Sequence, residues 1–220
     1  MLVKVNAANR NSDDHSLTLA GECAFCSEFK HRKGTEIFGE GGETEYVYQI
    51  ISGAVRTHRR LADGRRQINS FHLPGDMFGL ENGAKYRFSA EALVETKVRI
   101  VNQRNLLAAF ESRANGRTQL LRLVTQSLRH AENHMLLLGR KTALEKVAAF
   151  ILEMDERQAH PDAMVLPMGR RDIADYLGLS LETVSRALST LQEEGLLWCD
   201  GATRKRFIIL SRAGLAKYDA

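Results

Sequence analysis

The chain has 220 residues, of which 44% are hydrophobic and 26% charged, and its formal net charge is +4. This is a globular composition, which excludes disorder over most of the chain. There is no stretch of about 18 apolar residues and no apolar segment near the N-terminus, so we expect a cytoplasmic protein with neither a membrane span nor a secretory signal. Three cysteines, Cys23, Cys26 and Cys199, are too few for a disulfide framework, which fits a reducing compartment.

Residues 1–30 show no sustained hydrophobic period and are expected to form a tail. Residues 31–104 carry short runs rich in β-branched and aromatic residues, which predict strands. Turn signals separate these runs, at Gly41-Gly42, Ser52-Gly53, Asp63-Gly64 and Pro74-Gly75. We therefore expect this segment to form a compact all-β roll or barrel.

From residue 105 to residue 139 the period changes to that of a helix, with Gly116 as an internal weak point, so we expect one long helix or two in series. Six residues of this segment alternate at spacings of three and four, as in the seam of a coiled coil: Leu121, Val124, Leu128, Ala131, Met135 and Leu138. The seam predicts that this helix pairs two copies of the chain. The alternative is a helix that lies only on its own domain.

Residues 140–220 show the order helix, short apolar strand, helix, turn, helix and hairpin, which is typical of a winged helix-turn-helix. Within it, Ala174, Gly178 and Val184 have the spacing of the helix-turn-helix, where a small residue permits close approach and glycine makes the turn. The fold class is therefore α+β, with an N-terminal β-roll, a long dimerisation helix and a C-terminal winged helix-turn-helix.

The second helix of the motif is predicted over residues 181–194, with Ser180 as its N-terminal cap and Gly195 at its exit. Glu182, Ser185 and Arg186 share a face of its first turns, which in a recognition helix enter the major groove and can hydrogen-bond base edges. A plain surface ion pair between Glu182 and Arg186 is the alternative, and both interpretations can hold together. Further side chains are expected on the DNA backbone: Arg170, Arg171, Thr183, Arg204, Lys205 and Arg206.

Several motifs resemble those of the CRP/FNR superfamily of bacterial transcription regulators, namely LPGDMFG at residues 73–79, ETVSR at residues 182–186, and the segments DYLGLS and GRKTALEKVAAF. Two longer segments, ADGRRQINSFHLPGDMFG and LPMGRRDIADYLGL, are most similar to the FixK branch, which regulates microaerobic respiration and nitrogen fixation in rhizobia. The resemblance implies a homodimeric activator on an FNR-type inverted repeat of double-stranded DNA, with Glu182, Ser185 and Arg186 reading each half-site. It also implies that exposed roll loops, such as that around Lys85, contact RNA polymerase.

Relatives that bind cyclic nucleotides carry a Gly-Glu pair and an Arg-Ser pair around the cyclic phosphate, and this chain departs from both. Gly79 is followed by Leu80, with Glu81 displaced by one position, and Ser89 is preceded by Phe88. A phosphate without a guanidinium partner would lose its bidentate charged hydrogen bonds. We therefore expect no cyclic nucleotide and a roll that serves mainly as a scaffold.

The candidate metal and cluster ligands do not make complete sets. Cys23 and Cys26 form a lone pair, whereas an iron–sulfur cluster needs four ligands and Cys199 is predicted in the distant wing. His130 and His134 have a metal-ligand spacing but no third ligand, so we expect them on a solvated helix face. We assign neither a metal nor any other cofactor.

Two other functions remain open from the sequence. One is a redox- or ligand-gated regulator of the same fold, switched by Cys23 and Cys26 or by a small effector in the roll. The other is an enzyme or a structural partner that reuses the roll. The chain shows no nucleophile with a base, no phosphate-binding loop and no paired catalytic carboxylates, so we do not expect an enzyme.

Overall fold

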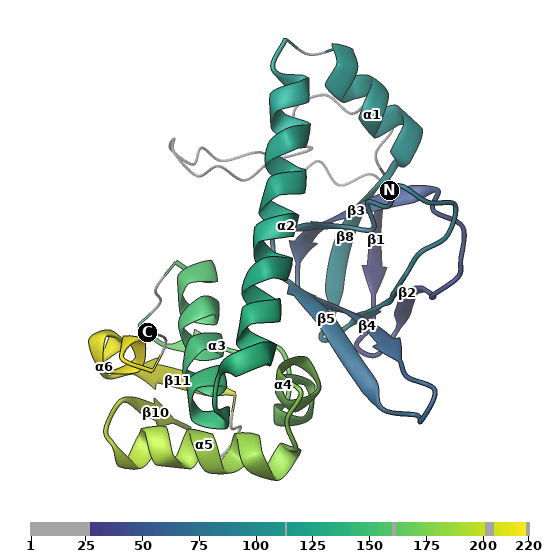
Figure 1. Ribbon diagram of the computed structural model, residues 1–220. Coiled ribbons are helices and arrows are strands. Elements are labelled where there is room, and N and C mark those ends of the chain that lie inside the picture. The colour runs from purple at the N-terminus through teal and green to yellow at the C-terminus, as the bar shows by residue number, and fades with distance from the viewer. Residues whose placement is uncertain (1–26, 113, 160–161, 201–204, 219–220) are drawn as a thin grey trace, which may run out of the picture.

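The computed structural model describes residues 27–112, 114–159, 162–200 and 205–218. A β-roll lies beside one long helix, and a smaller domain of helices and short strands lies at the far end of that helix (Figure 1). This arrangement confirms the predicted architecture. Cys23, Cys26 and Arg204 lie outside the described residues. Within the described ranges, no helix is both long enough and apolar enough to cross a membrane.

The roll consists of two four-stranded antiparallel sheets, with strand orders β1-β8-β3-β6 and β2-β7-β4-β5. Its strands are β1 (Ser27–His31), β2 (Glu36–Phe38), β3 (Tyr46–Ser52), β4 (Val55–Arg60), β5 (Arg66–His72), β6 (Met77–Phe78), β7 (Ser89–Ala92) and β8 (Thr96–Asn102). The predicted turn at Asp63-Gly64 joins β4 to β5, with Gly64 at φ 86°. Gly53 has φ 92°, and a Cβ there would lie 2.5 Å from the carbonyl oxygen of Glu95, so this turn requires glycine.

Aromatic side chains fill the interior of the roll. Phe38 stacks on Tyr86 with ring centroids 3.8 Å apart, and Tyr48 stacks on Phe78 at 5.1 Å. They form one cluster with apolar residues of both sheets. Stacked rings of this kind bury large apolar areas, so these side chains give the roll a hydrophobic core of its own.

The helical segment after the roll forms two helices, α1 (Gln103–Ser112) and α2 (Gly116–Arg140), which is the second of the two arrangements we expected. A Cβ at Gly116 would lie 1.7 Å from the carbonyl oxygen of Phe110. The start of α2 therefore packs directly on the end of α1, which only glycine permits. Leu106 and Phe110 of α1 pack into a cluster with Val47 and Val101 of the roll.

The C-terminal half begins with α3 (Ala143–Arg157), whose first turn is closed by a capping box between Thr142 and Glu145. The remaining elements are β9 (Met164–Val165), α4 (Arg170–Leu177), α5 (Leu181–Glu193), β10 (Leu197–Cys199), β11 (Arg206–Ile209) and α6 (Arg212–Ala216). The three strands form one sheet in the order β10-β11-β9, which is the wing. The sequence did not lead us to expect α6, which is only five residues long and is capped by the Ser211 hydroxyl.

The roll and the C-terminal half share one hydrophobic core. Phe71 of β5 lies 5.1 Å from the ring of Tyr176 in α4 and 6.1 Å from that of Phe150 in α3, measured between ring centroids. All three side chains are buried. The core cluster that contains them runs from Ala54 in the roll to Leu215 in α6. Residues more than 70 positions apart in the chain therefore stabilise one another directly.

Candidate nucleic-acid interface

The turn between α4 and α5 has the geometry that the motif predicted. Gly178 adopts a left-handed conformation (φ 64°, ψ 37°) and its amide donates to the carbonyl oxygen of Ala174. The amide of Leu179 donates to the same oxygen at 3.0 Å. Ala174 and Val184 are buried where the two helices meet. A residue with a Cβ would be strained at position 178, so the crossing of the two helices depends on this glycine.

The first turn of α5 is capped by Ser180, whose hydroxyl accepts from the amide of Thr183 at 3.1 Å. This cap satisfies a backbone amide that the helix itself leaves free. The apolar face of α5 packs inward through Val184, Leu188 and Leu191, all of them buried. The opposite face of the first two turns is therefore directed outward.

The three proposed base-reading residues lie on this outward face. Glu182 and Arg186 are exposed, and Ser185 is half-buried. Hydrogen bonds from the backbone amide of Glu182 and from the hydroxyl of Ser180 lower the pKa of the Glu182 carboxyl, with weaker coulombic effects of Arg171 and Arg186. Glu182 is therefore ionised at neutral pH, which suits an acceptor for the amino group of a cytosine.

The proposed backbone-contacting residues are placed less uniformly. Arg171 and Arg206 are exposed, whereas Arg170 and Thr183 are half-buried, and the Thr183 hydroxyl lies 2.9 Å from that of Ser180. The Nζ of Lys205 donates to the carbonyl oxygen of Pro167 at 3.1 Å, so this ammonium is engaged within the domain. Arg171 and Arg186 are thus exposed within the helix-turn-helix itself, and Arg206 is exposed in the wing.

The exposed face of α2 carries most of the predicted seam. Exposed fractions are 66% for Leu121, 50% for Val124, 56% for Leu128 and 67% for Met135, and Ala131 is also exposed. Leu138 is half-buried and lies against the Gly178 turn. Leu136, which the seam did not include, is 68% exposed. In a single chain, these apolar side chains form a stripe without a covering element among the described residues.

Our expectation that His130 and His134 lie on a solvated face is wrong. The ring of His134 stacks on that of Tyr176 at 4.1 Å, and its Nε2 donates to the Tyr176 carbonyl oxygen at 2.9 Å. His130 hydrogen-bonds the hydroxyl of Ser70 through Nε2 at 3.2 Å. The error arose because a four-residue spacing specifies one face of a helix but not what packs there. No cluster of three or more potential metal ligands occurs within the part of the chain that the structure describes.

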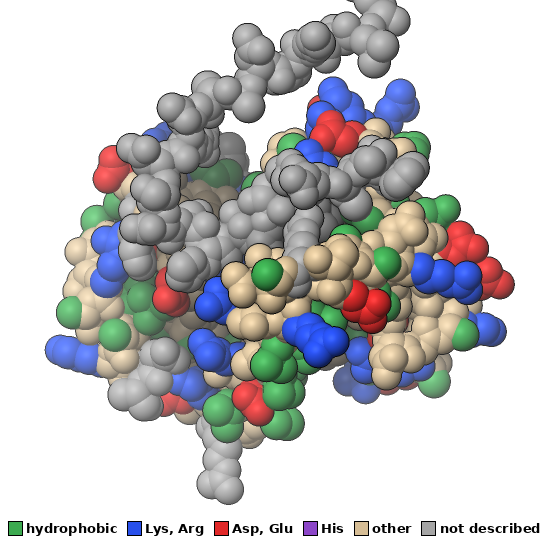
Figure 2. All heavy atoms as spheres, turned by 90° about the horizontal axis from the view of Figure 1, so that it is seen from above, with side chains coloured by type: hydrophobic (Ala, Val, Ile, Leu, Met, Phe, Trp, Pro, Cys, Tyr) green, Lys and Arg blue, Asp and Glu red, His purple; other side chains and the backbone are tan. Residues whose placement is uncertain are grey.

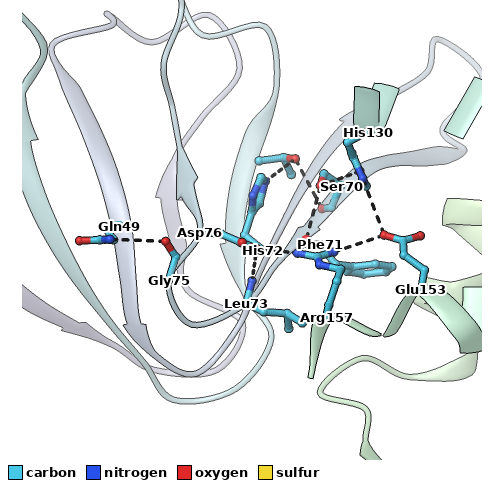
Figure 3. A network of polar contacts seen from close by, with 11 residues as sticks. Gln49, Ser70, Phe71, His72, Leu73, Gly75, Asp76, His130, Glu153 and Arg157 are labelled. Atoms are coloured by element: carbon cyan, nitrogen blue, oxygen red, sulfur yellow. Dashed lines mark hydrogen bonds and ion pairs between the residues drawn. The ribbon is translucent and has the colours of Figure 1, made fainter. Parts of the chain in front are cut away.

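A polar network joins β5, α2 and α3 around His130 (Figure 3). Arg157 donates to the carbonyl oxygen of Phe71 at 2.9 Å and pairs with Asp76 at 2.5 Å. Glu153 lies between Arg157 and His130, at 3.4 Å and 3.7 Å. Burial raises the pKa of the Glu153 carboxyl and lowers the pKa of His130. The network therefore ties the helix that follows α2 to the roll.

A second polar contact, which the sequence reasoning missed, joins the roll to the helix-turn-helix itself. Arg56 and Arg66, on β4 and β5, pair with Asp172 and Asp175 on α4. The signal in the sequence was the three-residue spacing of the two aspartates, which places them on one face of α4. Nothing in the sequence indicates which cations, about a hundred positions away, this face would meet.

Glu81 and Ser89, the residues nearest in sequence to the pairs that hold the cyclic phosphate in nucleotide-binding relatives, are engaged in contacts within the roll. Glu81 pairs with Arg87 at 2.7 Å, and the hydroxyl of Ser89 accepts from the amide of Glu40 at 2.9 Å. Burial lowers the pKa of His72 to about 4, and its ring stacks on Phe78 at 5.1 Å. These side chains thus contribute to the packing of the roll.

Comparison with known proteins matches both halves of the chain. Residues 28–113 match the cyclic nucleotide-binding domain family, and residues 145–218 match the Crp-like helix-turn-helix domain family. The nitrogen fixation regulation protein FixK of Rhizobium meliloti is 44% identical over 167 residues, which cover 76% of each protein. FixK of Azorhizobium caulinodans is 42% identical over 193 residues, covering 86% of this chain and 77% of that protein.

The same relationship appears among solved structures. FixK2 from Bradyrhizobium japonicum superposes with a TM-score of 0.84 at 52% identity, covering 89% of this chain and 98% of that one. The similarity includes the roll, the long helix and the helix-turn-helix, and the relatives are transcription regulators rather than enzymes. With the motif geometry described above, these matches show that the chain belongs to the CRP/FNR family of DNA-binding transcription regulators, in its FixK-like branch.

Proposed function

We propose that this protein is a cytoplasmic, homodimeric transcription activator of genes for nitrogen fixation or microaerobic respiration. The observation that carries the base-reading part is the outward face of α5. Glu182, Ser185 and Arg186 lie there, on the first two turns of a capped helix whose apolar face is buried. The names of the FixK relatives support the choice of genes. Exposed loops of the roll, such as that around Lys85, would contact RNA polymerase.

Each of the three side chains offers a different base-edge chemistry. The guanidinium of Arg186 can donate two hydrogen bonds to O6 and N7 of a guanine, and the Glu182 carboxylate can accept from N4 of a cytosine. The hydroxyl of Ser185 can do either. A helix that enters the major groove by its N-terminal turns brings these groups to neighbouring base pairs.

Dimerisation through α2 accounts for the exposed apolar stripe. A second copy would bury Leu121, Val124, Leu128 and Met135 against their equivalents, as a and d residues do in a coiled coil. A two-fold dimer would place two α5 helices over half-sites about 34–36 Å apart, one turn of the double helix. The DNA site is therefore an inverted repeat.

DNA binding without a small effector is the third part of the proposal. The interior of the roll is filled by its own stacked rings, and Glu81 and Ser89 are held by neighbouring groups. A cyclic nucleotide would have to displace these contacts, and the guanidinium beside them, that of Arg87, is already paired with Glu81. We assign no cofactor to the roll.

One experiment tests DNA binding, the symmetry of the site and effector independence together. The full-length protein is incubated aerobically, without additives, with a pool of random DNA duplexes, and the bound sequences are selected and read. We expect a symmetric motif with half-sites one helical turn apart, in which Arg186→Ala relaxes the preference at one base pair of each half-site. Selection of an asymmetric motif would exclude the dimer model. Enrichment only after addition of a cyclic nucleotide or a reductant would exclude effector independence.

A further inference from the structure

Two arginines of the β4–β5 hairpin hold the first helix of the helix-turn-helix. Arg66 donates from Nε to Oδ2 of Asp175 at 2.8 Å, and its Nη2 lies 2.6 Å from Asp175 and 2.7 Å from Oδ1 of Asp172. Arg56 pairs with the same Oδ1 of Asp172 and, at 2.8 Å, with Glu91 of β7. We call Arg56, Arg66, Asp172 and Asp175 the hairpin clamp.

The clamp is largely shielded from water. The side chains of its four members are between 13% and 20% exposed, and that of Glu91 is 23% exposed. Ion pairs that are partly buried are screened by salt less than surface pairs, and removing one partner leaves the other charge poorly solvated. Moving α4 away from the hairpin would separate these charges and would therefore cost free energy.

The geometry of the clamp restrains direction as well as distance. Oδ1 of Asp172 receives both arginines, while its Oδ2 accepts from the amide of Gly169 at 3.2 Å, at the start of α4. One turn further along α4, Asp175 is held by two nitrogens of a single guanidinium. Nε and Nη2 of Arg66 both meet Oδ2 of Asp175, and Nη2 also meets Oδ1 of Asp172, so one planar guanidinium spans the two carboxylates and permits little rotation between them. The helix is therefore held at two points along its axis.

The surrounding packing places the clamp where it can orient the recognition helix. β5 runs beside α4 (Figure 1), and the side-chain amide of Gln67 donates to the Tyr176 carbonyl oxygen at 3.4 Å. α4 and α5 are joined by the Gly178 turn and by the buried contact of Ala174 and Val184. An orientation imposed on α4 is thus transmitted to α5 as a rigid unit.

We infer that Arg56 and Arg66 are positioning residues for DNA recognition, which hold the helix-turn-helix on the roll in the orientation that binds DNA. The inference rests on the proposed DNA-binding function. It adds how a roll that binds no effector sets the orientation of the helix-turn-helix. In a dimer the clamp occurs twice, and both recognition helices must be placed. If loss of the clamp left about one third of each subunit in the competent orientation, the affinity of the dimer would fall about tenfold.

Charge exchange across the clamp is the sharpest test. The variants are Arg66→Asp, Asp175→Arg and the double variant, which has the net charge of the wild type. Arg66 is preferred to Arg56, since removal of Arg56 would also release Glu91. The matched control is Arg65→Asp, because Arg65 lies next to Arg66 but, within the described part of the chain, pairs with Asp63 alone and is 77% exposed. Affinity is measured on the inverted repeat that the wild type selects and on a random duplex.

We expect each single variant to lose about tenfold or more in affinity for the inverted repeat and the double variant to recover most of it. Arg65→Asp should stay within about threefold of the wild type on the inverted repeat. On the random duplex, where affinity follows charge, Arg66→Asp should match Arg65→Asp and the double variant should match the wild type. Arg66→Lys, which keeps the charge but not the two-point geometry, should lie between Arg66→Asp and the wild type.

Thermal unfolding, followed by the fluorescence of the single tryptophan, Trp198, separates positioning from stability. Loss of affinity in a variant that remains folded at the assay temperature supports the inference. Single effects that simply add in the double variant, or a loss equal to that of Arg65→Asp, would overturn it. If the wild type itself fails to select a site that depends on Arg186, the proposed function fails instead.

Discussion

Glu182 lies at the first turn of α5 with its carboxylate already hydrogen-bonded by its own amide and the Ser180 hydroxyl. These donors favour the ionised carboxylate, which is the form that can accept a hydrogen bond from a base amino group. Arg186, one turn along, is exposed. In the proposed interface the two residues would therefore act differently, since the Glu182 carboxylate would accept hydrogen bonds and the Arg186 guanidinium would donate them.

Arg186→Ala should weaken binding to the selected inverted repeat by about 1–3 kcal/mol per half-site and relax the preference at one base pair. The reason is the loss of a two-point contact with a base edge. Arg171→Ala, at an exposed position early in α4, is the comparison. It should weaken binding to all sequences alike. The slope of log affinity against log salt concentration should become shallower by about one per half-site. Equal losses for both variants on specific and random DNA would contradict this division.

His72 makes the stability of the protein sensitive to acid. Burial lowers the pKa of His72 to about 4, below its ordinary value near 6.5. The unfolded chain therefore binds a proton first as the pH falls, and stability present above about pH 6.5 is lost between about pH 6.5 and pH 4. The loss from this one group is up to about 3 kcal/mol.

His72→Gln should flatten this part of the pH dependence, measured by chemical unfolding at pH 7, 6, 5 and about 4. Burial also lowers the pKa values of His58, His130 and His134, so some dependence should persist in the variant. Identical slopes for the variant and the wild type would show that His72 is not protonated on unfolding.

At the scale of elements, α2 has two faces with different tasks. Leu120 and Leu123 pack on the cluster shared by α1 and the roll, and Leu137 belongs to the core of the C-terminal half. The opposite face carries the exposed seam residues. The helix is thus anchored at both ends, and its apolar stripe is held in place for a partner.

Leu128→Lys, in the middle of this stripe, should convert the dimer into a monomer, because two ammonium groups would face each other in an apolar seam. Gln126→Lys adds the same charge on the exposed side of α2 away from the seam and should leave the dimer intact. Sedimentation equilibrium measures the mass of both variants. A Leu128→Lys variant that is still dimeric and still binds the inverted repeat would exclude this face as the interface.

The sequence was most informative where the signal is local. Ser180, Gly178 and Gly195 predicted the start, the turn and the exit of the motif helices, because caps and left-handed turns depend on a few neighbouring residues. The predicted end of the recognition helix, residue 194, is one position beyond the observed Glu193. The break before α2 stayed ambiguous, since it depends on how closely Gly116 approaches Phe110 in space.

At the scale of the whole molecule, the contacts that matter most were invisible in the sequence. Arg66 and Asp175 are 109 positions apart, and Ser70 and His130 are 60 apart. A residue pattern shows that a side chain is charged or polar, but not which distant strand it will meet. For the same reason, Phe71 was predicted only as part of a strand, whereas it lies in the core of the C-terminal half.

The shared core predicts that the described part of the chain unfolds as one cooperative unit. Phe71→Ala, in the roll, should lower the free energy of unfolding by about 3–5 kcal/mol and shift the transition seen by Trp198 in the wing by the same amount. The far-UV circular dichroism and the tryptophan fluorescence should give coincident curves. Two separate transitions, with Trp198 unaffected by Phe71→Ala, would show that the halves unfold independently.

The same core bears on how this protein could be re-engineered. In a regulator built from a sensing domain and a DNA-binding domain, one domain can be exchanged for another by joining the two within the connecting helix. Here a cut in the connecting helix would leave Phe71, Leu73 and the clamp arginines in the N-terminal part and their partners in the C-terminal part. A working chimera would need the β4–β5 hairpin to be transferred together with the helix-turn-helix domain. The practical boundary for such an exchange therefore passes through the roll and not between the two domains.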